Sequence, residues 1–398
     1  MTLKEGNTYV MSTGLAESFI QQMYNVTDTF TEVNISSTNF GSLVSAVTTP
    51  SGLMSTDLQK LINFIDFIII QSVVILSGIA ANGLSIYSFA KIGLGDTVTI
   101  SFFALSLTDM CCLLVAVYNW LCYTLYRSPV SWPVDMFTLM YLGVWYFQAF
   151  YDVSMLITTY TAVQKCCCIA LPFHFRSVFT KRRTFVVIVC IVLLCGAAYA
   201  PVFATQGLQK VSGISNNTST SYTVWFSSNR EEIIGINDII IRVFLQNACE
   251  VIVLSCLFIL TNTLRRQYNF RRSVSLHSFS DVSNDASQND IVNNNQQGAS
   301  HDKVNKVSAK ELQVIKSVTL LSAVFVTCNM PRIVLSLARV IVPELDTYRR
   351  FHNIHLTLQM FRRVVEVSGT SANFIILYKF NYTFREAIVN LFQCCKAH

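Results

Sequence analysis

Asp109 is the residue whose setting most clearly suggests chemistry, because it is the only charged residue between positions 97 and 126. A charged group in hydrocarbon costs roughly 2.5–3.5 kcal/mol on insertion scales, so such groups face a protein interior and usually serve a purpose. Asn82, Ser154 and Asn373 lie in other apolar stretches and are candidates to meet it. The alternative is a carboxyl group that is merely buried, protonated and hydrogen-bonded. We expect a polar centre that can hold a sodium ion, and no other cofactor.

The histidines do not support metal-dependent or nucleophilic catalysis. All six lie in loops, in tails or at the outer edge of the last apolar stretch, at His174, His277, His301, His352, His355 and His398. A membrane enzyme would need a nucleophile dyad or a His/Asp cluster inside the apolar stretches. We therefore expect no enzymatic activity and no metal site.

The 13 cysteines do not form the pattern of a secreted disulfide framework. They lie within apolar stretches or near the C-terminus, where Cys acts as a small buried hydrophobe or as a lipidation site. Residues 380–392 have the pattern of a short amphipathic helix on a membrane surface, and Cys394 and Cys395 follow it. Cysteines beside such a helix are candidates for palmitoylation, with free thiols as the alternative.

These residues must be positioned by membrane-spanning helices. Hydrophobic residues make up 52% of the 398 residues and charged residues only 13%, about half the charged fraction of a soluble domain. A span needs about 20 mostly apolar residues. Seven stretches qualify, at 61–90, 97–126, 134–171, 184–204, 233–264, 312–342 and 353–380, and the last three are weaker because of their charges. The pattern predicts an all-α membrane protein, a seven-transmembrane helix bundle with a short amphipathic eighth helix.

Lys and Arg gather on one side of the predicted spans, which indicates the orientation of the chain. The loops after the third and fifth spans and the C-terminal tail are rich in these residues, and the opposite side is poorer. We expect a multi-pass plasma-membrane protein with its N-terminus outside and its C-terminus in the cytoplasm. The predicted domains are an extracellular tail (1–60), the bundle (61–380) and the amphipathic helix with the cytoplasmic tail (381–398).

Four glycosylation sequons lie on the predicted outer face, at Asn25, Asn34, Asn216 and Asn217. Such sequons often arise by chance, but their agreement with the charge pattern supports glycosylation at this face. On the other face, residues 268–306 are rich in Ser, Asn and Gln, which predicts a disordered cytoplasmic loop.

Several short motifs follow one another along the predicted spans. They are Ala81-Asn82, Leu105-x-Leu107-Thr108-Asp109, the spacing to Cys166 and Pro172, Phe325-x-x-Cys328-x-x-Pro331, and Asn373 with Phe384-Arg385. Together they resemble the motifs of rhodopsin-like (class A) G-protein-coupled receptors. The stretch from Gln164 to Phe173 is similar to chemosensory receptors of invertebrates, molluscs in particular, and to their neuropeptide-receptor relatives.

The sequence departs from this family at four places. The Asp-Arg-Tyr motif of the third span is Gln164-Lys165-Cys166 here, and the Asn-Pro-x-x-Tyr motif of the seventh span lacks its proline after Asn373. The cysteine pair of the outer loop is absent, with Met140 near the position of the first cysteine. The aromatic Trp of the sixth span is Asn329, which we expect to join the polar network of Asp109, Ser154 and Asn373.

The resemblance implies a latch between the inner ends of the third and sixth spans. Lys165 and Glu311 stand where the family pairs an Arg with an acidic residue. Lys lacks the bidentate fork of Arg, so this pair should contribute only about 0.5–2 kcal/mol at a site that borders water. Two separate charges at the membrane edge are the alternative. Cys166 and Pro172 would belong to the same G-protein-coupling region.

Pro331 is the expected hinge of the sixth span. Proline removes one backbone hydrogen bond from a helix and kinks it, so the inner half of the span, which contains Phe325, can swing outward. Such a movement opens a groove for a helix of a partner protein.

The resemblance also places a ligand site in the outer half of the bundle. Its lining would comprise Phe147, Tyr151, Arg332, Arg363 and Glu366, with Arg242 as a further candidate. Phe147 stands where amine receptors place an acidic residue, so a protonated amine is not expected. Arg332 and Arg363 favour an anionic group such as a carboxylate or a peptide C-terminus. The alternative is that Arg363 and Glu366, three apart on a helix, neutralise each other.

These features predict a receptor that binds an extracellular ligand and activates a heterotrimeric G protein by an outward swing of the sixth span. The expected ligand is a chemosensory small molecule, with a neuropeptide as the alternative. Further expected partners are membrane lipids, arrestins and kinases, and no nucleic acid. A transporter is the rival class, but the internal repeats typical of transporters are not found in the sequence. A non-signalling decoy receptor also stays open, because of the altered inner motifs.

Overall fold

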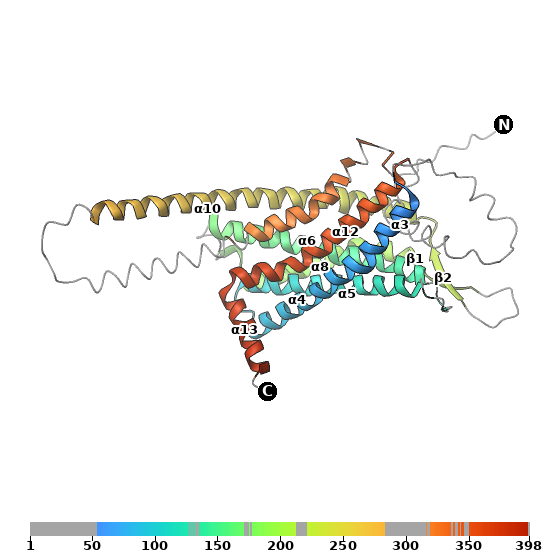
Figure 1. The fold of residues 1–398 in the computed structure, drawn as a ribbon, viewed down its shortest axis with the longest axis horizontal. Helices are drawn as coiled ribbons and strands as arrows, with labels where there is room; N and C mark the ends of the chain where they lie inside the picture. The colour runs from blue at the N-terminus through green and yellow to red at the C-terminus, as the bar shows by residue number, and fades with distance from the viewer. Residues whose placement is uncertain are drawn as a thin grey trace.

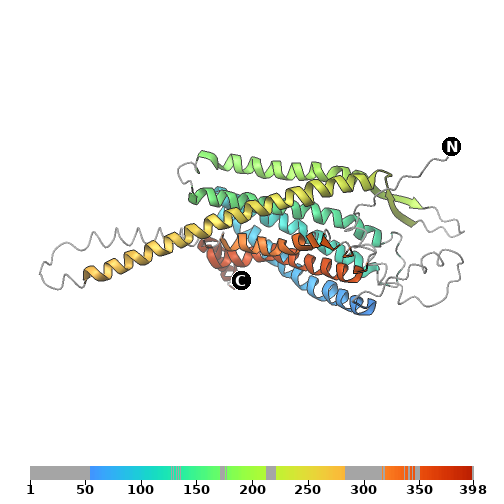
Figure 2. The same cartoon turned by 90° about the horizontal axis from the view of Figure 1, so that it is seen from above.

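The computed structural model describes residues 54–126, 136–170, 177–211, 221–282, 319–335 and 350–396, with isolated residues between these ranges. Its helices run side by side along the long axis of the molecule, and a β-hairpin lies at one end of them (Figures 1 and 2). We call this end the hairpin end. The opposite end, where the last helix of the chain lies, is the α13 end.

The first described rod consists of α3 (Thr56–Phe64), the π-helical segment η1 (Ile65–Ile70) and α4 (Gln71–Ile92). Ser55 begins it, because its hydroxyl accepts a hydrogen bond from the Leu58 amide at 3.3 Å. Gly93 ends it with φ +85°, a conformation that favours glycine.

Three long helices follow, α5 (Thr97–Tyr126), α6 (Met136–Ala170) and α8 (Lys181–Ala204). After α8 the chain forms an antiparallel hairpin of β1 (Gln206–Val211) and β2 (Ser221–Phe226), which the sequence did not predict.

A second composite rod is formed by α9 (Arg230–Asn237), the π-helical segment η2 (Asp238–Leu245) and α10 (Gln246–Val282). The far part of α10 extends well beyond the other helices at the α13 end (Figure 1). The prediction of a disordered loop from residue 268 is therefore wrong for residues 268–282, which continue the helix. The rest of that predicted loop lies outside the described residues.

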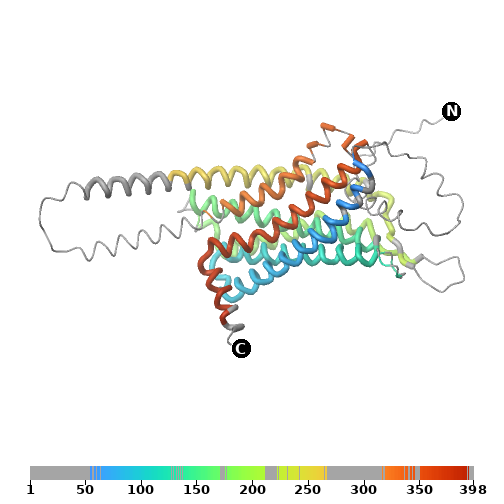
Figure 3. The backbone as a smooth tube through the Cα atoms, viewed as in Figure 1, coloured from blue at the N-terminus to red at the C-terminus, as the bar shows by residue number. Residues whose placement is uncertain are grey.

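The last part of the chain contains the helix Thr319–Leu335 (the 319–335 helix), α12 (His352–Phe380) and α13 (Tyr382–Lys396). The chain turns sharply between α12 and α13 (Figure 3). Asn381 forms the turn, and its side-chain oxygen accepts a hydrogen bond from the Phe384 amide at 3.1 Å. Phe384 is fully buried and packs on Phe89 of α4, with ring centroids 5.1 Å apart, which fixes α13 against the end of the bundle.

Within the described part of the chain, five helices are long and apolar enough to cross a membrane: Ile65–Ile92, Thr97–Tyr126, Thr138–Ala170, Lys181–Ala204 and Glu232–Thr263. They correspond to the first five predicted spans. The sixth predicted span is described over Thr319–Leu335, which is a shorter apolar helix. The seventh corresponds to α12, which is 29 residues long but carries several charges. The protein is therefore helical, with several helices that can enter a membrane.

Close packing of α5 against α6 depends on Gly143. A Cβ atom at this position would lie 2.1 Å from Oδ1 of Asn119 and 2.7 Å from the ring of Tyr118. Asn119 is buried, and the Tyr118 hydroxyl donates to the Leu139 carbonyl at 3.0 Å, so neither side chain moves aside easily. Small residues allow close approach of helices in membranes, where no hydrophobic effect drives their association.

Gly143→Ala should lower the stability of the protein by about 1–3 kcal/mol, because an added methyl group in a filled space displaces its neighbours. The matched control is Gly196→Ala in α8, where no atom lies within 4 Å of the added Cβ. Thermal unfolding in detergent, followed by the reaction of buried cysteines with a thiol-reactive dye, measures both. An unchanged unfolding temperature for Gly143→Ala would contradict the close packing.

Candidate functional site

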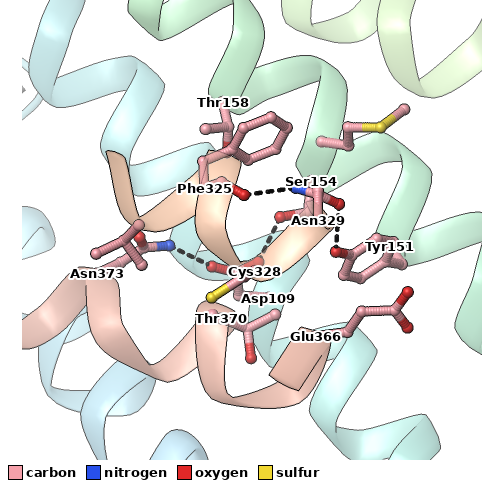
Figure 4. A pocket seen from close by; sticks show the side chains of 13 residues that line it. Asp109, Tyr151, Ser154, Thr158, Phe325, Cys328, Asn329, Glu366, Thr370 and Asn373 are labelled. Carbon is pink, nitrogen blue, oxygen red and sulfur yellow. Dashed lines mark hydrogen bonds between the residues drawn. The ribbon is translucent and has the colours of Figure 1, made fainter. Parts of the chain in front are cut away.

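Asp109 lies at the centre of the bundle and is completely buried. The Ser154 hydroxyl donates to its Oδ1 at 2.5 Å, and the Asn373 amide donates to its Oδ2 at 2.9 Å (Figure 4). Both partners were expected from the sequence. Because they come from α6 and α12, the carboxyl group joins its own helix α5 to the next helix of the chain and to a helix far along it.

Asn82 does not take the place that the sequence analysis gave it. Its amide donates to the carbonyls of Gly78 at 3.0 Å and Thr370 at 3.1 Å. Asn82 therefore connects α4 to α12, while Thr370 itself lines the cavity beside Asp109. Asn82 therefore contacts a residue that lines the cavity rather than Asp109 itself.

A cavity of about 40 Å³ opens beside Asp109, between α6, α12 and the 319–335 helix (Figure 4). This volume holds about three water molecules, so it is too small for an organic ligand of ordinary size. Its polar lining residues include Ser154, Thr158, Asn329, Thr370 and Asn373. Glu366 brings a second carboxyl group to the same cavity.

The oxygens of this cavity fit the sodium ion expected at Asp109. Carboxylate, hydroxyl and amide oxygens are the ligands that hard cations prefer. The side chains that would hold the ion are Asp109, Ser154 and Asn373, with Asn329 and Thr370 on the same wall. Glu366 is neutralised by Arg362. An ionised Asp109 would attract a monovalent cation, which would supply no redox or acid–base chemistry. Among the described residues, no group of three or more His, Cys, Asp or Glu side chains gathers to hold a metal ion.

Asn329 lies on the cavity wall but bonds to Tyr151. The Tyr151 hydroxyl donates to its side-chain oxygen at 2.8 Å, and its amide nitrogen donates to the Phe325 carbonyl at 2.9 Å. The predicted network thus includes Asn329 through the shared cavity rather than through a hydrogen bond to Asp109. Tyr151, predicted as a ligand contact, is buried and holds the 319–335 helix to α6.

The charged residues predicted for the ligand site are already engaged within the protein. Arg332 lies 3.8 Å from Oδ1 of Asp152, and both side chains are buried. Glu366 forms an ion pair with Arg362, four residues earlier on the same helix. The sequence analysis gave neutralisation of Glu366 by a neighbouring arginine as the alternative to ligand contact. The structure shows such a pair, but its arginine is Arg362 and not Arg363. The guanidinium of Arg363 lies 4.3 Å from the ring centre of Phe147.

Asp152 is the residue that the sequence analysis passed over. It is completely buried on α6, and it accepts hydrogen bonds from Gln148 at 3.0 Å and from the Tyr199 hydroxyl at 2.5 Å. It lies in an apolar stretch, as Asp109 does, and this signal could have identified it. Lys165 in the same stretch made it less conspicuous than the isolated Asp109.

The residues expected at the inner side lie near the α13 end of α6. Lys165 and Cys166 are both buried. Cys166 packs in an apolar cluster with Val253 and Cys256 of α10, and Phe325 of the 319–335 helix packs against it. Glu311 and Pro172 lie outside the described residues, so the latch between Lys165 and Glu311 stays a prediction.

Several modification sites are likewise not described. Asn25, Asn34, Asn216 and Asn217 lie outside the described residues. The backbone of α13 includes Cys394 and Cys395, but their side chains are not described, and neither is that of Arg242 in η2.

At the hairpin end, Arg230 fixes the hairpin to α6. Its guanidinium donates to the Tyr141 hydroxyl at 2.8 Å and to the Gln206 side chain at 2.7 Å. It also donates to Thr205 at 3.0 Å and lies 4.8 Å from the ring centre of Phe226 on β2. Tyr141 directly follows Met140, the residue near the position of the missing disulfide cysteine. A buried guanidinium therefore connects the hairpin to α6.

No protein-family model matches this chain, and a search of curated proteins finds no significant match.

Arg230→Ala should release the hairpin from α6, because it removes several hydrogen bonds and the aromatic contact together. We expect chymotrypsin to cleave the hairpin at least tenfold faster, and Arg230→Lys to restore only part of the protection because Lys lacks the planar fork. Lys210→Ala, which removes an exposed cation from β1, is the control and should have no effect. Wild-type protection of Arg230→Ala would show that the hairpin is held by other contacts.

Proposed function

We propose that the protein is a receptor of the rhodopsin-like, G-protein-coupled type, which binds an extracellular ligand and activates a heterotrimeric G protein. The observation that carries this proposal is the buried carboxyl group of Asp109, bonded to Ser154 and Asn373. The cavity beside it is walled by the proline-bearing 319–335 helix. A change in the bend of that helix would therefore alter the polar centre, and a change at the polar centre would alter the bend.

The proposed seven-helix bundle would consist of the five apolar helices, the 319–335 helix and α12. The charges of α12 do not prevent it from spanning, because Arg362, Arg363 and Glu366 are all buried. Its exposed surface includes Phe361 and Ile375, which suit contact with lipid. An odd number of spans places the two termini on opposite sides of the membrane.

In the proposed receptor, Pro331 divides the 319–335 helix into two parts with different contacts. Tyr151 holds Asn329, and Asp152 lies beside Arg332, so α6 contacts the helix on both sides of the proline. Toward the α13 end, Phe325 makes apolar contacts with the cluster around Cys166. Apolar contacts have no preferred direction, and this part of the helix can slide or swing with a small change in energy.

The α13 end would face the cytoplasm, where α13 lies on the membrane surface as an eighth helix. Its apolar face packs on α4 through Phe384, and Arg385 and Lys396 provide positive charge for anionic lipids. Palmitoylation of Cys394 and Cys395 would add a second membrane anchor to this helix. The hairpin end would then be extracellular, in agreement with the sequons at Asn216 and Asn217.

The ligand is proposed to be a small molecule that enters from the hairpin end. Arg332 and Arg362 already contact acidic side chains, so an anionic ligand would have to compete with Asp152 or Glu366. Arg363, whose guanidinium lies over the Phe147 ring, is the proposed contact for a carboxylate, which would have to compete with contacts inside the protein there as well. Screening carboxylates and short peptides against Arg363→Ala and the wild type separates this contact from a general loss of binding.

Lys165→Glu should raise basal nucleotide exchange roughly 2- to 30-fold, the change that corresponds to a latch of about 0.5–2 kcal/mol. Adding Glu311→Lys should restore the low basal rate, because the pair is reformed with its charges exchanged. Exchange by a panel of G proteins in cell membranes provides the measurement. Lys316→Glu, a reversal of an exposed charge near the same end, is the matched control and should change little.

If no G protein exchanges nucleotide faster with any of these variants, at equal surface expression, the receptor function is wrong. If Lys165→Glu activates but Glu311→Lys does not restore the low rate, the receptor function stands and the latch has another acidic partner.

Sodium should stabilise the protein through Asp109. At 150 mM, replacing choline by sodium should raise the unfolding temperature by about 2 °C, which corresponds to roughly 1 kcal/mol of binding energy. Asp109→Asn should abolish this difference, because it removes the charge that holds the ion. Asp66→Asn, at a buried aspartate of η1 that does not line the cavity, should leave it intact. An equal response of both variants to sodium would exclude the cavity as the ion site.

A further inference from the structure

Asp152 connects three helices at the level of Pro331. Its two oxygens accept hydrogen bonds from different elements, Oδ1 from Gln148 of α6 itself and Oδ2 from Tyr199 of α8. Arg332 of the 319–335 helix approaches Oδ1 to 3.8 Å. Asp152 and Tyr199 are both completely buried, and Arg332 is 5% exposed. A carboxylate removed from water in this way needs a counter-charge, and Arg332 supplies it.

Arg332 and Asn329 lie on opposite sides of Pro331, so their contacts to α6 hold different parts of the helix. Arg332 directly follows Pro331, on the side of the hairpin end, whereas Asn329 precedes the proline. The contact between Tyr151 and Asn329 is a hydrogen bond of 2.8 Å, which is lost when the atoms separate by less than 1 Å. The attraction between the charges of Asp152 and Arg332 falls only gradually with distance. A bend that moves Asn329 away from α6 would therefore break the first contact before it weakens the second.

We propose that the Asp152–Arg332 pair is the pivot of the 319–335 helix, with Asp152 as the positioning residue for Arg332. The pair holds the segment beyond Pro331 to α6 and, through Tyr199, to α8, while the segment before the proline moves. The pivot rests on the proposed receptor function, since it assigns a role in the bend that drives signalling. The ion pair itself does not depend on that function.

The Tyr199 contact explains how α8 takes part. Most of α8 faces outward, with Phe185, Leu193 and Leu194 exposed. Tyr199 is an exception, because it is fully buried and its hydroxyl reaches Asp152. A hydroxyl that donates to a charged oxygen forms a stronger hydrogen bond than one between neutral groups. The pair is thereby fixed to α8 as well as to α6.

A double-mutant cycle on the purified full-length protein tests the pair. Asp152→Asn and Arg332→Gln should each lower the unfolding temperature by about 5 °C or more, because each leaves a buried charge without its partner. The double variant should lose clearly less than the sum of the two shifts, because neither charge remains. The matched control combines Arg332→Gln with Asp66→Asn, another buried aspartate, and its shifts should add.

Tyr199→Phe provides a milder change if a single charge variant does not fold. It should lower the unfolding temperature of the wild type more than that of the Asp152→Asn/Arg332→Gln variant, because the hydroxyl bonds more strongly to a charged than to a neutral group. Additive shifts in the cycle, or an equal effect of Tyr199→Phe in both backgrounds, would overturn the proposal.

The second arm distinguishes a pivot from a merely structural pair. In membranes, adding Asp152→Asn/Arg332→Gln to Lys165→Glu should reduce the raised nucleotide exchange at least threefold at equal surface expression. If the shifts in unfolding temperature are non-additive but nucleotide exchange does not change, the pair is an ion pair with a structural role only, and the pivot is overturned. Coupled shifts without exchange in any variant would overturn the receptor function, and the pivot with it, while the ion pair would still be established.

Discussion

A carboxyl group that is completely removed from solvent among apolar helices must find its hydrogen-bond partners inside the protein. At Asp109 this requirement is met by Ser154 and Asn373, which approach from α6 and α12. Each bond fixes the rotation of its helix about its own axis, because a turn of one residue would carry the side chain away by about 100°. Asn82 extends the same constraint to α4 through the Thr370 carbonyl. Four helices are thus aligned by a few polar contacts in a bundle whose remaining contacts are largely non-directional.

The charges in the last helices obey the same physical constraint. Arg332 lies beside Asp152, and Arg362 pairs with Glu366, so these charges are directed at one another in the interior. A hydropathy scale adds the cost of each side chain separately, and for this reason the proposed sixth and seventh spans look weak in the sequence. Lipid contacts only the outer surface of a helix, where α12 presents residues such as Phe361 and Ile375. Burial of paired charges would reconcile the charged sequence of α12 with its proposed place in the membrane.

Much of the helical framework could be predicted because a membrane-crossing helix leaves a long apolar signal in the sequence. Ser154 and Asn373 were named as candidate partners of Asp109, but the stretches that contain them hold many other polar residues, so polarity alone did not single them out. The partner of Glu366 was not, because a choice between Arg362 and Arg363 depends on side-chain directions rather than spacing alone. Arg230 was missed for a different reason: a basic residue at the end of a helix looks solvent-exposed until the hairpin that covers it is known. The hairpin itself gave no strong pattern, since β1 and β2 are short.

The π-helical segment η1 has a consequence for how this chain can vary in length. A π-turn accommodates one residue more than an α-turn, so it is the place where an α-helix has absorbed a single inserted residue. Loss of one residue from Ile65–Ile70 would restore regular helix and rotate α3 by about 100° relative to α4. Met54, whose carbonyl accepts a hydrogen bond from Asn353 of α12 at 3.0 Å, would then point away from that helix. The segment η1 therefore sets the rotation of α3 relative to α4. This rotation allows the first turn of the rod to contact α12 while α4 packs on α5.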